Sequence, residues 1–122
     1  MSVCLNFADI VYTNSWTSQT TNLASMIAIT APAGGGLYRV SSTVSLHTNT
    51  GNAGMNLTWN DGNSNQSANV VNALSSGGST PNTVLTNSCV SFFVAGGQDI
   101  SIIASVSGGA TYDLYVAIEK LI

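Results

Sequence analysis

The stretch that decides the fold is LYRVSSTVSLH, residues 37–47. Every second side chain from Tyr38 to Leu46 is apolar, with Ser42 as the exception, and the side chains between them are all polar. Such an alternation places the two sets on opposite faces of a β-strand. The stretch therefore predicts a long strand with one face in the core and the other face polar.

Shorter alternating stretches occur on both sides of this strand, separated by breaks rich in Gly, Asn and Pro. We expect eight strands, over residues 7–13, 24–31, 37–47, 55–59, 66–74, 84–94, 99–106 and 112–119. None is followed by a segment with helical periodicity, so the pairing should be antiparallel. Eight such strands in 122 residues favour a jelly roll over a seven-stranded immunoglobulin-type sandwich. We therefore expect residues 1–122 to form a single all-β domain, an antiparallel β-sandwich.

Charged residues are scarce: the 122 residues include two Lys or Arg and five Asp or Glu, against roughly a quarter of an average protein. Two cations cannot form the basic patch that a nucleic acid or an anionic membrane surface requires, so we expect neither as a partner. No apolar run is long enough to span a membrane, and the N-terminus lacks the basic and apolar regions of a signal peptide. We therefore expect the chain to be made in a cytoplasm and not exported.

Ser, Thr and Asn take the place of the missing charges and contribute 43 residues. A monomer covered with hydroxyls and amides has little charge repulsion to oppose self-association. This composition suits a protein that works within an assembly of identical neighbours.

The order of three segments resembles a known group of jelly rolls. Residues 36–41 (GLYRVS) open a long strand after a Pro-Ala-Gly turn, residues 94–100 (VAGGQDI) form a later turn, and residues 108–121 end in an aromatic-rich strand. This order resembles the jelly rolls related to tumour necrosis factor and the globular head of complement C1q. It resembles still more the short Ser/Thr/Asn-rich jelly rolls of bacteriophage virions, which serve as capsid decoration (cement) proteins or fibre heads.

The resemblance implies a homotrimer in which the final strand lies near the threefold axis. Tyr112 and every second residue after it would then fill the core, while Tyr115 and Ala117 face a neighbour, although the reverse assignment of faces stays open. Trp16 lies in a polar stretch, and aromatic side chains are enriched at the centres of interfaces. The candidate trimer interface comprises Trp16, Tyr112, Tyr115 and Ala117.

Catalytic and metal-binding motifs are weak. His47 is the single histidine, and no nucleophile motif accompanies it, so we interpret it as a surface residue. Residues 61–65 (DGNSN) match the first half of a calcium loop, but the sixth and twelfth positions hold Gln66 and Asn72 instead of Gly and Glu. We expect a plain turn there, two reduced thiols at Cys4 and Cys89, no catalytic, cofactor or metal site, and no enzyme activity.

Two functions follow from these observations. The first is a structural virion protein, a trimeric decoration or cement protein or a fibre head, whose partner is the major capsid protein or another virion protein. The alternative is a lectin-like head for host-surface glycans, because sugar sites combine an aromatic ring with Asn, Asp and Thr side chains. Trp59 alternates in phase with Met55 and Leu57 and is interpreted as core. The candidate glycan contacts are therefore Trp16, Asn63 and Asn65.

Overall fold

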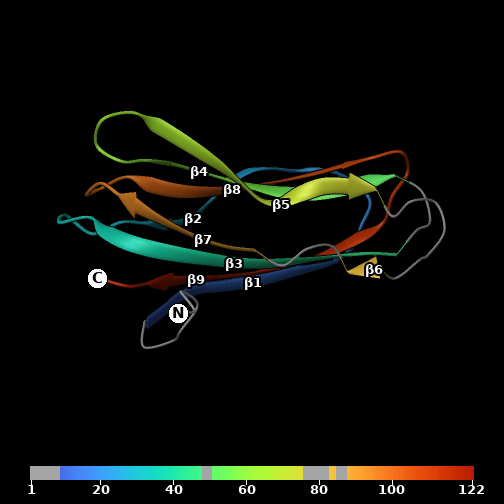
Figure 1. Ribbon diagram of the computed structural model, residues 1–122, viewed down its shortest axis with the longest axis horizontal. Coiled ribbons are helices and arrows are strands. Elements are labelled where there is room, and N and C mark those ends of the chain that lie inside the picture. The colour runs from blue at the N-terminus through green and yellow to red at the C-terminus, as the bar shows by residue number, and fades with distance from the viewer. Residues whose placement is uncertain (1–8, 48–50, 76–82, 85–87) are drawn as a thin grey trace.

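The computed structural model describes residues 9–47, 51–75, 83–84 and 88–122, which form two antiparallel sheets packed face to face (Figure 1). The described residues hold nine strands: β1 (Asp9–Gln19), β2 (Leu23–Thr30), β3 (Gly36–Leu46), β4 (Asn52–Asn60), β5 (Asn65–Ser75), β6 (Thr83–Val84), β7 (Ser88–Val94), β8 (Asp99–Ser107) and β9 (Tyr112–Lys120).

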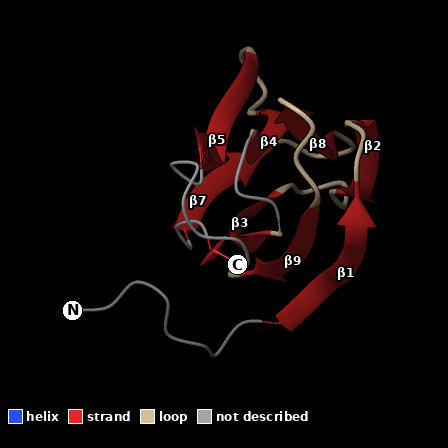
Figure 2. Cartoon of the chain, turned by 90° about the vertical axis from the view of Figure 1, so that its right-hand side faces the viewer, coloured by secondary structure: helices blue, strands red, loops and turns tan. Residues whose placement is uncertain are grey.

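The first sheet has the order β1-β9-β3, with β7 and the two-residue β6 both paired to the far side of β3. The second sheet has the order β2-β8-β4-β5. Figure 2 shows the two layers from one end of the sandwich, with the strands in this order in each layer. Because the chain passes repeatedly from one sheet to the other, this arrangement is a jelly roll, and the all-β antiparallel sandwich predicted from the sequence is confirmed.

The predicted strands match the structure within a few residues, with three differences. β1 extends to Gln19, so most of the polar stretch predicted after residue 13 is an edge strand paired with β9. β4 begins at Asn52, inside an expected turn. The strand predicted at 84–94 corresponds to β6, which ends at Val84, and to β7, which begins at Ser88, with residues 85–87 outside the described part of the chain. Polar side chains at an edge face water and do not interrupt the backbone ladder, so composition alone mistakes such a strand for a loop.

Parts of the sequence-based interpretation fall outside the described residues. They are the first two residues of the strand predicted at 7–13, residues 85–87 of the strand predicted at 84–94, Cys4, and the side chains of Asn72 and Cys89.

The core lies between the sheets and contains the apolar set of the deciding stretch. Tyr38, Val40, Val44 and Leu46 are all buried. Arg39, on the opposite and nominally polar face of β3, is nevertheless only 2% exposed. A buried guanidinium needs a charged partner because its desolvation is costly. That partner is Glu119 of β9, which accepts hydrogen bonds from Nε at 3.0 Å and from Nη2 at 3.1 Å.

The final strand supplies four buried side chains on one face: Tyr112, Leu114, Val116 and Ile118. The face that the sequence left open is therefore assigned, and Tyr115, on the other face, is 43% exposed. Tyr112 is fully buried within its own chain, and its hydroxyl donates a hydrogen bond of 2.9 Å to the carbonyl of Thr21. It is a core residue and offers no surface to a neighbouring subunit, which corrects its place in the candidate interface.

Candidate binding groove

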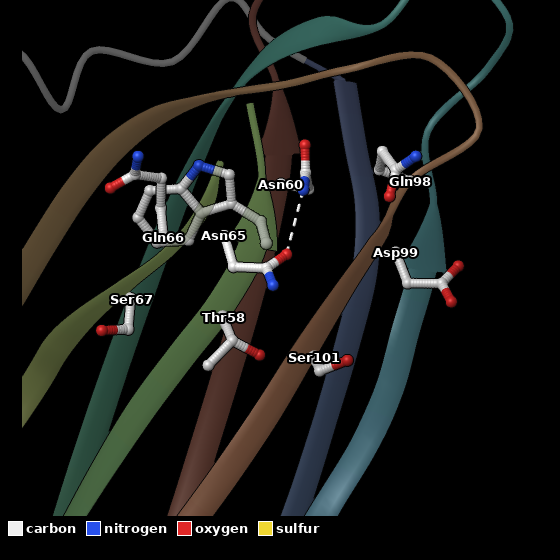
Figure 3. Close-up of a pocket in the computed structure, with 9 residues that line it drawn as sticks. Thr58, Asn60, Asn65, Gln66, Ser67, Gln98, Asp99 and Ser101 are labelled. Carbon is white, nitrogen blue, oxygen red and sulfur yellow. Dashed lines mark hydrogen bonds between the residues drawn. The ribbon is translucent and has the colours of Figure 1, made fainter. Parts of the chain in front are cut away.

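A shallow groove of about 480 Å³ lies on the second sheet, at the end where the β4–β5 and β7–β8 turns meet (Figure 3). Three strands contribute to its lining, which is made of amides, hydroxyls, one carboxylate and one indole ring. The lining residues are Thr58, Trp59 and Asn60 of β4, Asn65, Gln66 and Ser67 of β5, and Gln98, Asp99 and Ser101 at the start of β8.

Strand register brings these side chains together. Thr58 is the partner of Ser67 on β5 and of Ser101 on β8. Residues at paired positions project from the same face of a sheet. Leu57 and Ile102, the residues adjacent to Thr58 and Ser101 along their strands, are fully buried, so the three hydroxyls project from the outer face.

The β4–β5 turn lies beside the groove and is held by hydrogen bonds within the turn. The Asp61 carboxylate accepts hydrogen bonds from the backbone N–H groups of Asn63 and Ser64, each at 2.9 Å. These two bonds, Ser64 first, lower the pKa of Asp61 from its usual value. The other carboxylate oxygen accepts a bond of 3.2 Å from the Gln66 amide. Both oxygens of Asp61 are thus engaged within the loop, and residues 61–64 form a turn as the sequence predicts.

The opposite wall is the β7–β8 turn, which is fastened to strands on both sides. Ala95 donates its backbone N–H to the carbonyl of Asn60 at 3.0 Å, and Gly97 donates to the carbonyl of Ala31 at 3.0 Å. Next to this turn, the Asp99 carboxylate accepts a hydrogen bond of 2.5 Å from the Thr30 hydroxyl. The groove is therefore largely formed before any ligand arrives, which lowers the entropic cost of binding.

The aromatic part of the lining is anchored in the core. The Trp59 ring lies 4.6 Å from the ring of Phe92, centroid to centroid, and Phe92 in turn stacks with Tyr38 at 6.2 Å. Trp59 is only partly buried and packs against the core, as its phase with Met55 and Leu57 predicts. Trp59 is also one of the residues that line the groove.

The structure separates the sequence-predicted glycan residues. Asn65 lines the groove, where its side-chain oxygen accepts a bond of 2.9 Å from Asn60 (Figure 3). Asn63 is exposed in the adjoining turn. Trp16 belongs to β1 of the first sheet and packs, partly buried, against the core of its own chain, so it does not join the other two. Tyr115 and Ala117 lie on the outer face of the first sheet.

Most of the groove was missed from the sequence, in particular Gln66, Gln98, Asp99 and Ser101. The signal was present as polar positions in alternating strands. These positions could be combined into a site only with the strand order, because β8 lies between β2 and β4 although it begins 39 residues after the end of β4.

The side chain of His47, interpreted from the sequence as a surface residue, is 34% exposed and has an acidic partner. Its Nε2 lies 2.7 Å from a carboxylate oxygen of Asp113 on β9. The other oxygen of Asp113 accepts the backbone N–H of Ser18 at 2.7 Å, and this bond is the main cause of a lowered pKa for Asp113. Ser18 has a positive φ of 52° beside an irregularity in β1. Asp113 therefore holds the irregular end of β1 to the sheet.

Within the described part of the chain, no helix is long and apolar enough to cross a membrane. In the same residues, no three His, Cys, Asp or Glu side chains gather in a way that would hold a metal ion.

Comparison with known proteins gives one informative likeness. No protein-family model matches the chain, and no curated protein matches it. Among solved structures, the chain is similar to the CBM22-1 and GH10 modules of endo-1,4-β-D-xylanase 10B from Clostridium thermocellum, complexed with xylohexaose. The TM-score is 0.50 at 11% sequence identity, and the match covers 91% of this chain but only 28% of the xylanase chain. At this identity the likeness shows the jelly-roll sandwich fold alone.

Proposed function

We propose that the protein is a lectin-like head that binds neutral carbohydrate in the groove of the second sheet. The observation that carries this proposal is the lining itself, which combines residues with amide and hydroxyl side chains with Trp59. Amides and hydroxyls both donate and accept hydrogen bonds, as the hydroxyls of a sugar do. The indole ring offers a flat apolar surface to the C–H face of a sugar ring.

The charge of the groove supports a neutral ligand. Asp99 is the single charged residue among the described residues of the lining, and none of them is a Lys or Arg. A lone carboxylate accepts hydrogen bonds from sugar hydroxyls and repels anionic sugars.

The xylanase structure gives limited support. That protein carries a module named CBM22-1, a carbohydrate-binding module, and its structure holds xylohexaose. A shared fold does not transfer a function, because one fold hosts many sites. The proposal therefore stands on the groove residues of this chain.

A structural role in a virion is the second candidate, and a different face favours it. The outer face of the first sheet exposes Ile10 by 65%, Phe93 by 47% and Tyr115 by 43%. Few charges elsewhere on the chain oppose self-association. A homotrimer packed through this face would leave the second sheet outward, as in a fibre head or a capsid decoration that presents three grooves. Multivalent display would then raise the avidity for a glycan-coated surface.

A glycan array tests the first candidate. We expect neutral glycans to be retained by the wild type and lost by Asn65→Ala combined with Gln66→Ala, because both amides line the groove. Asn14→Ala, at an exposed position of β1, is the matched control and should bind as the wild type does. An array on which the wild type retains no neutral glycan contradicts the proposal. Co-sedimentation with capsids, run beside the array, tests the second candidate.

A further inference from the structure

We infer that the groove continues across β8 to the exposed Ile27 of β2, so that the site takes a chain of several neutral sugar units laid across the strands. This inference rests on the proposed carbohydrate-binding function, and it names the substrate class and a subsite outside the groove lining.

The strand register of the second sheet aligns one row of side chains from the groove to Ile27. Ser101 of β8 is the partner of Thr58 on one side and of Ile27 on the other. Thr58 is in turn the partner of Ser67 on β5. One row of side chains therefore crosses all four strands, and Figure 3 shows its three hydroxyl members, Ser67, Thr58 and Ser101, in line. Three strand spacings of about 4.8 Å make the row roughly 14 Å long, which exceeds the length of a single sugar ring.

Ile27 places an exposed apolar side chain at the end of this row. Its side chain is 61% exposed, whereas the neighbouring Met26 packs against the core. Paired with Ser101, Ile27 projects from the same outer face as the groove. Where the structure describes exposure, the other large exposed apolar side chains lie on the first sheet or at the C-terminus, so Ile27 is singular on the second sheet. An aliphatic side chain at the end of a row of hydroxyls suits the C–H face of a further sugar unit.

Asp99 places a carboxylate beside the proposed path of the ligand. Its partner across the same two strands is Thr30, whose hydroxyl donates to the carboxylate, so the carboxylate is held two residues along β8 from Ser101 of the row. A chain that reaches from the groove to Ile27 passes this carboxylate. Neutral units can donate hydroxyl hydrogens to it, whereas uronic acid units bring like charges together. The ligand class is therefore a neutral oligosaccharide.

Calorimetric titration with oligosaccharides of increasing length tests the inference. The probes are linear gluco-, manno-, galacto- and xylo-oligosaccharides from the disaccharide to the hexasaccharide, and oligogalacturonides of the same lengths. We expect the affinity of the wild type for a neutral series to rise with length. Ile27→Ser should leave disaccharide binding unchanged and lower the affinity for the longest chain about five- to tenfold, because the apolar contact is lost. Ile10→Ser, with a similarly exposed side chain on the first sheet, should match the wild type.

Each outcome separates the inference from the proposed function. Neutral binding that is already complete at the disaccharide, with Ile27→Ser equal to the wild type at every length, overturns the extended site and leaves glycan binding intact. Oligogalacturonides that bind as tightly as neutral chains overturn the assignment of the ligand class. If the wild type binds none of the series, the proposed function fails together with the inference.

Discussion

Arg39 and Glu119 form a two-point ion pair between β3 and β9, on the outer face of the first sheet. The Arg39 side chain is 3% exposed and that of Glu119 is 14% exposed. Two parallel hydrogen bonds in this fork geometry are stronger than a single contact and fix the register of the strands. With Ile10 as the partner of Glu119 on β1, the pair lies next to exposed apolar surface.

Removing one member of this pair should be costly. Glu119→Gln leaves the buried guanidinium without its countercharge, and we expect the free energy of unfolding to fall by about 2–3 kcal/mol. Arg39→Met combined with Glu119→Leu should recover most of this loss, because neither charge then needs solvation. Urea unfolding measures both. If the Glu119→Gln variant is as stable as the wild type, water reaches the ion pair.

Tyr115 tests the proposed trimer. Tyr115→Asp adds a charge to the outer face of the first sheet, and in the assembled state that charge is desolvated and unpaired, at a cost of several kcal/mol. We expect dissociated or insoluble protein, whereas Asn63→Asp in the exposed turn leaves assembly unchanged. Mass photometry at micromolar concentration reads the result. A wild type of 12.5 kDa, or an intact trimer of the Tyr115 variant, contradicts the assembly.

Acid should destabilise the fold through Asp61 and Asp113, since the pKa of each is lowered from 3.8 in the folded chain. The folded state therefore binds fewer protons than the unfolded state, and stability is lost as the pH falls through the folded pKa. We expect these carboxylates to leave stability flat above about pH 5 and to reduce it below about pH 4. The double variant with Asp61→Asn and Asp113→Asn should show a smaller acid loss in thermal melts. An unchanged acid midpoint in that variant counts against both contacts.

The two tryptophans report on the groove independently. Trp59 lines the groove and Trp16 lies on the first sheet, so a bound glycan should change the fluorescence of Trp59 alone. We expect Trp16→Phe to keep the ligand-induced change and Trp59→Phe to lose it. A response that persists without Trp59 would place the ligand elsewhere.

The fold could be predicted from the sequence because the alternation of apolar and polar residues is a local pattern. Period-two alternation in residues 37–47 and 112–119 predicts two strands without knowledge of their partners, and both strands are confirmed. The buried face of residues 37–47 is confirmed as well, whereas the buried face of the final strand was left open by the sequence and is assigned by the structure. The end of β1 was not accessible, because a solvent-facing edge strand and a polar loop have the same composition.

The groove and the buried ion pair required long-range information. Arg39 is buried because Glu119 lies opposite it, 80 residues later in the chain. Asn65 was found through its turn, but Gln98 and Ser101 join it only because β8 pairs with β4. Trp16 was selected by residue type, and the strand order places it on the other sheet.

The central claim, that the groove binds neutral carbohydrate, is tested most directly by following the side-chain amide resonances during titration with a neutral oligosaccharide retained on the array. Asn60, Asn65, Gln66 and Gln98 line the groove, while Asn14 lies exposed on β1. The account predicts saturable shifts of the four groove amides and an unchanged Asn14. Shifts that gather on the first sheet, or groove amides that stay unchanged at saturating ligand, would contradict it.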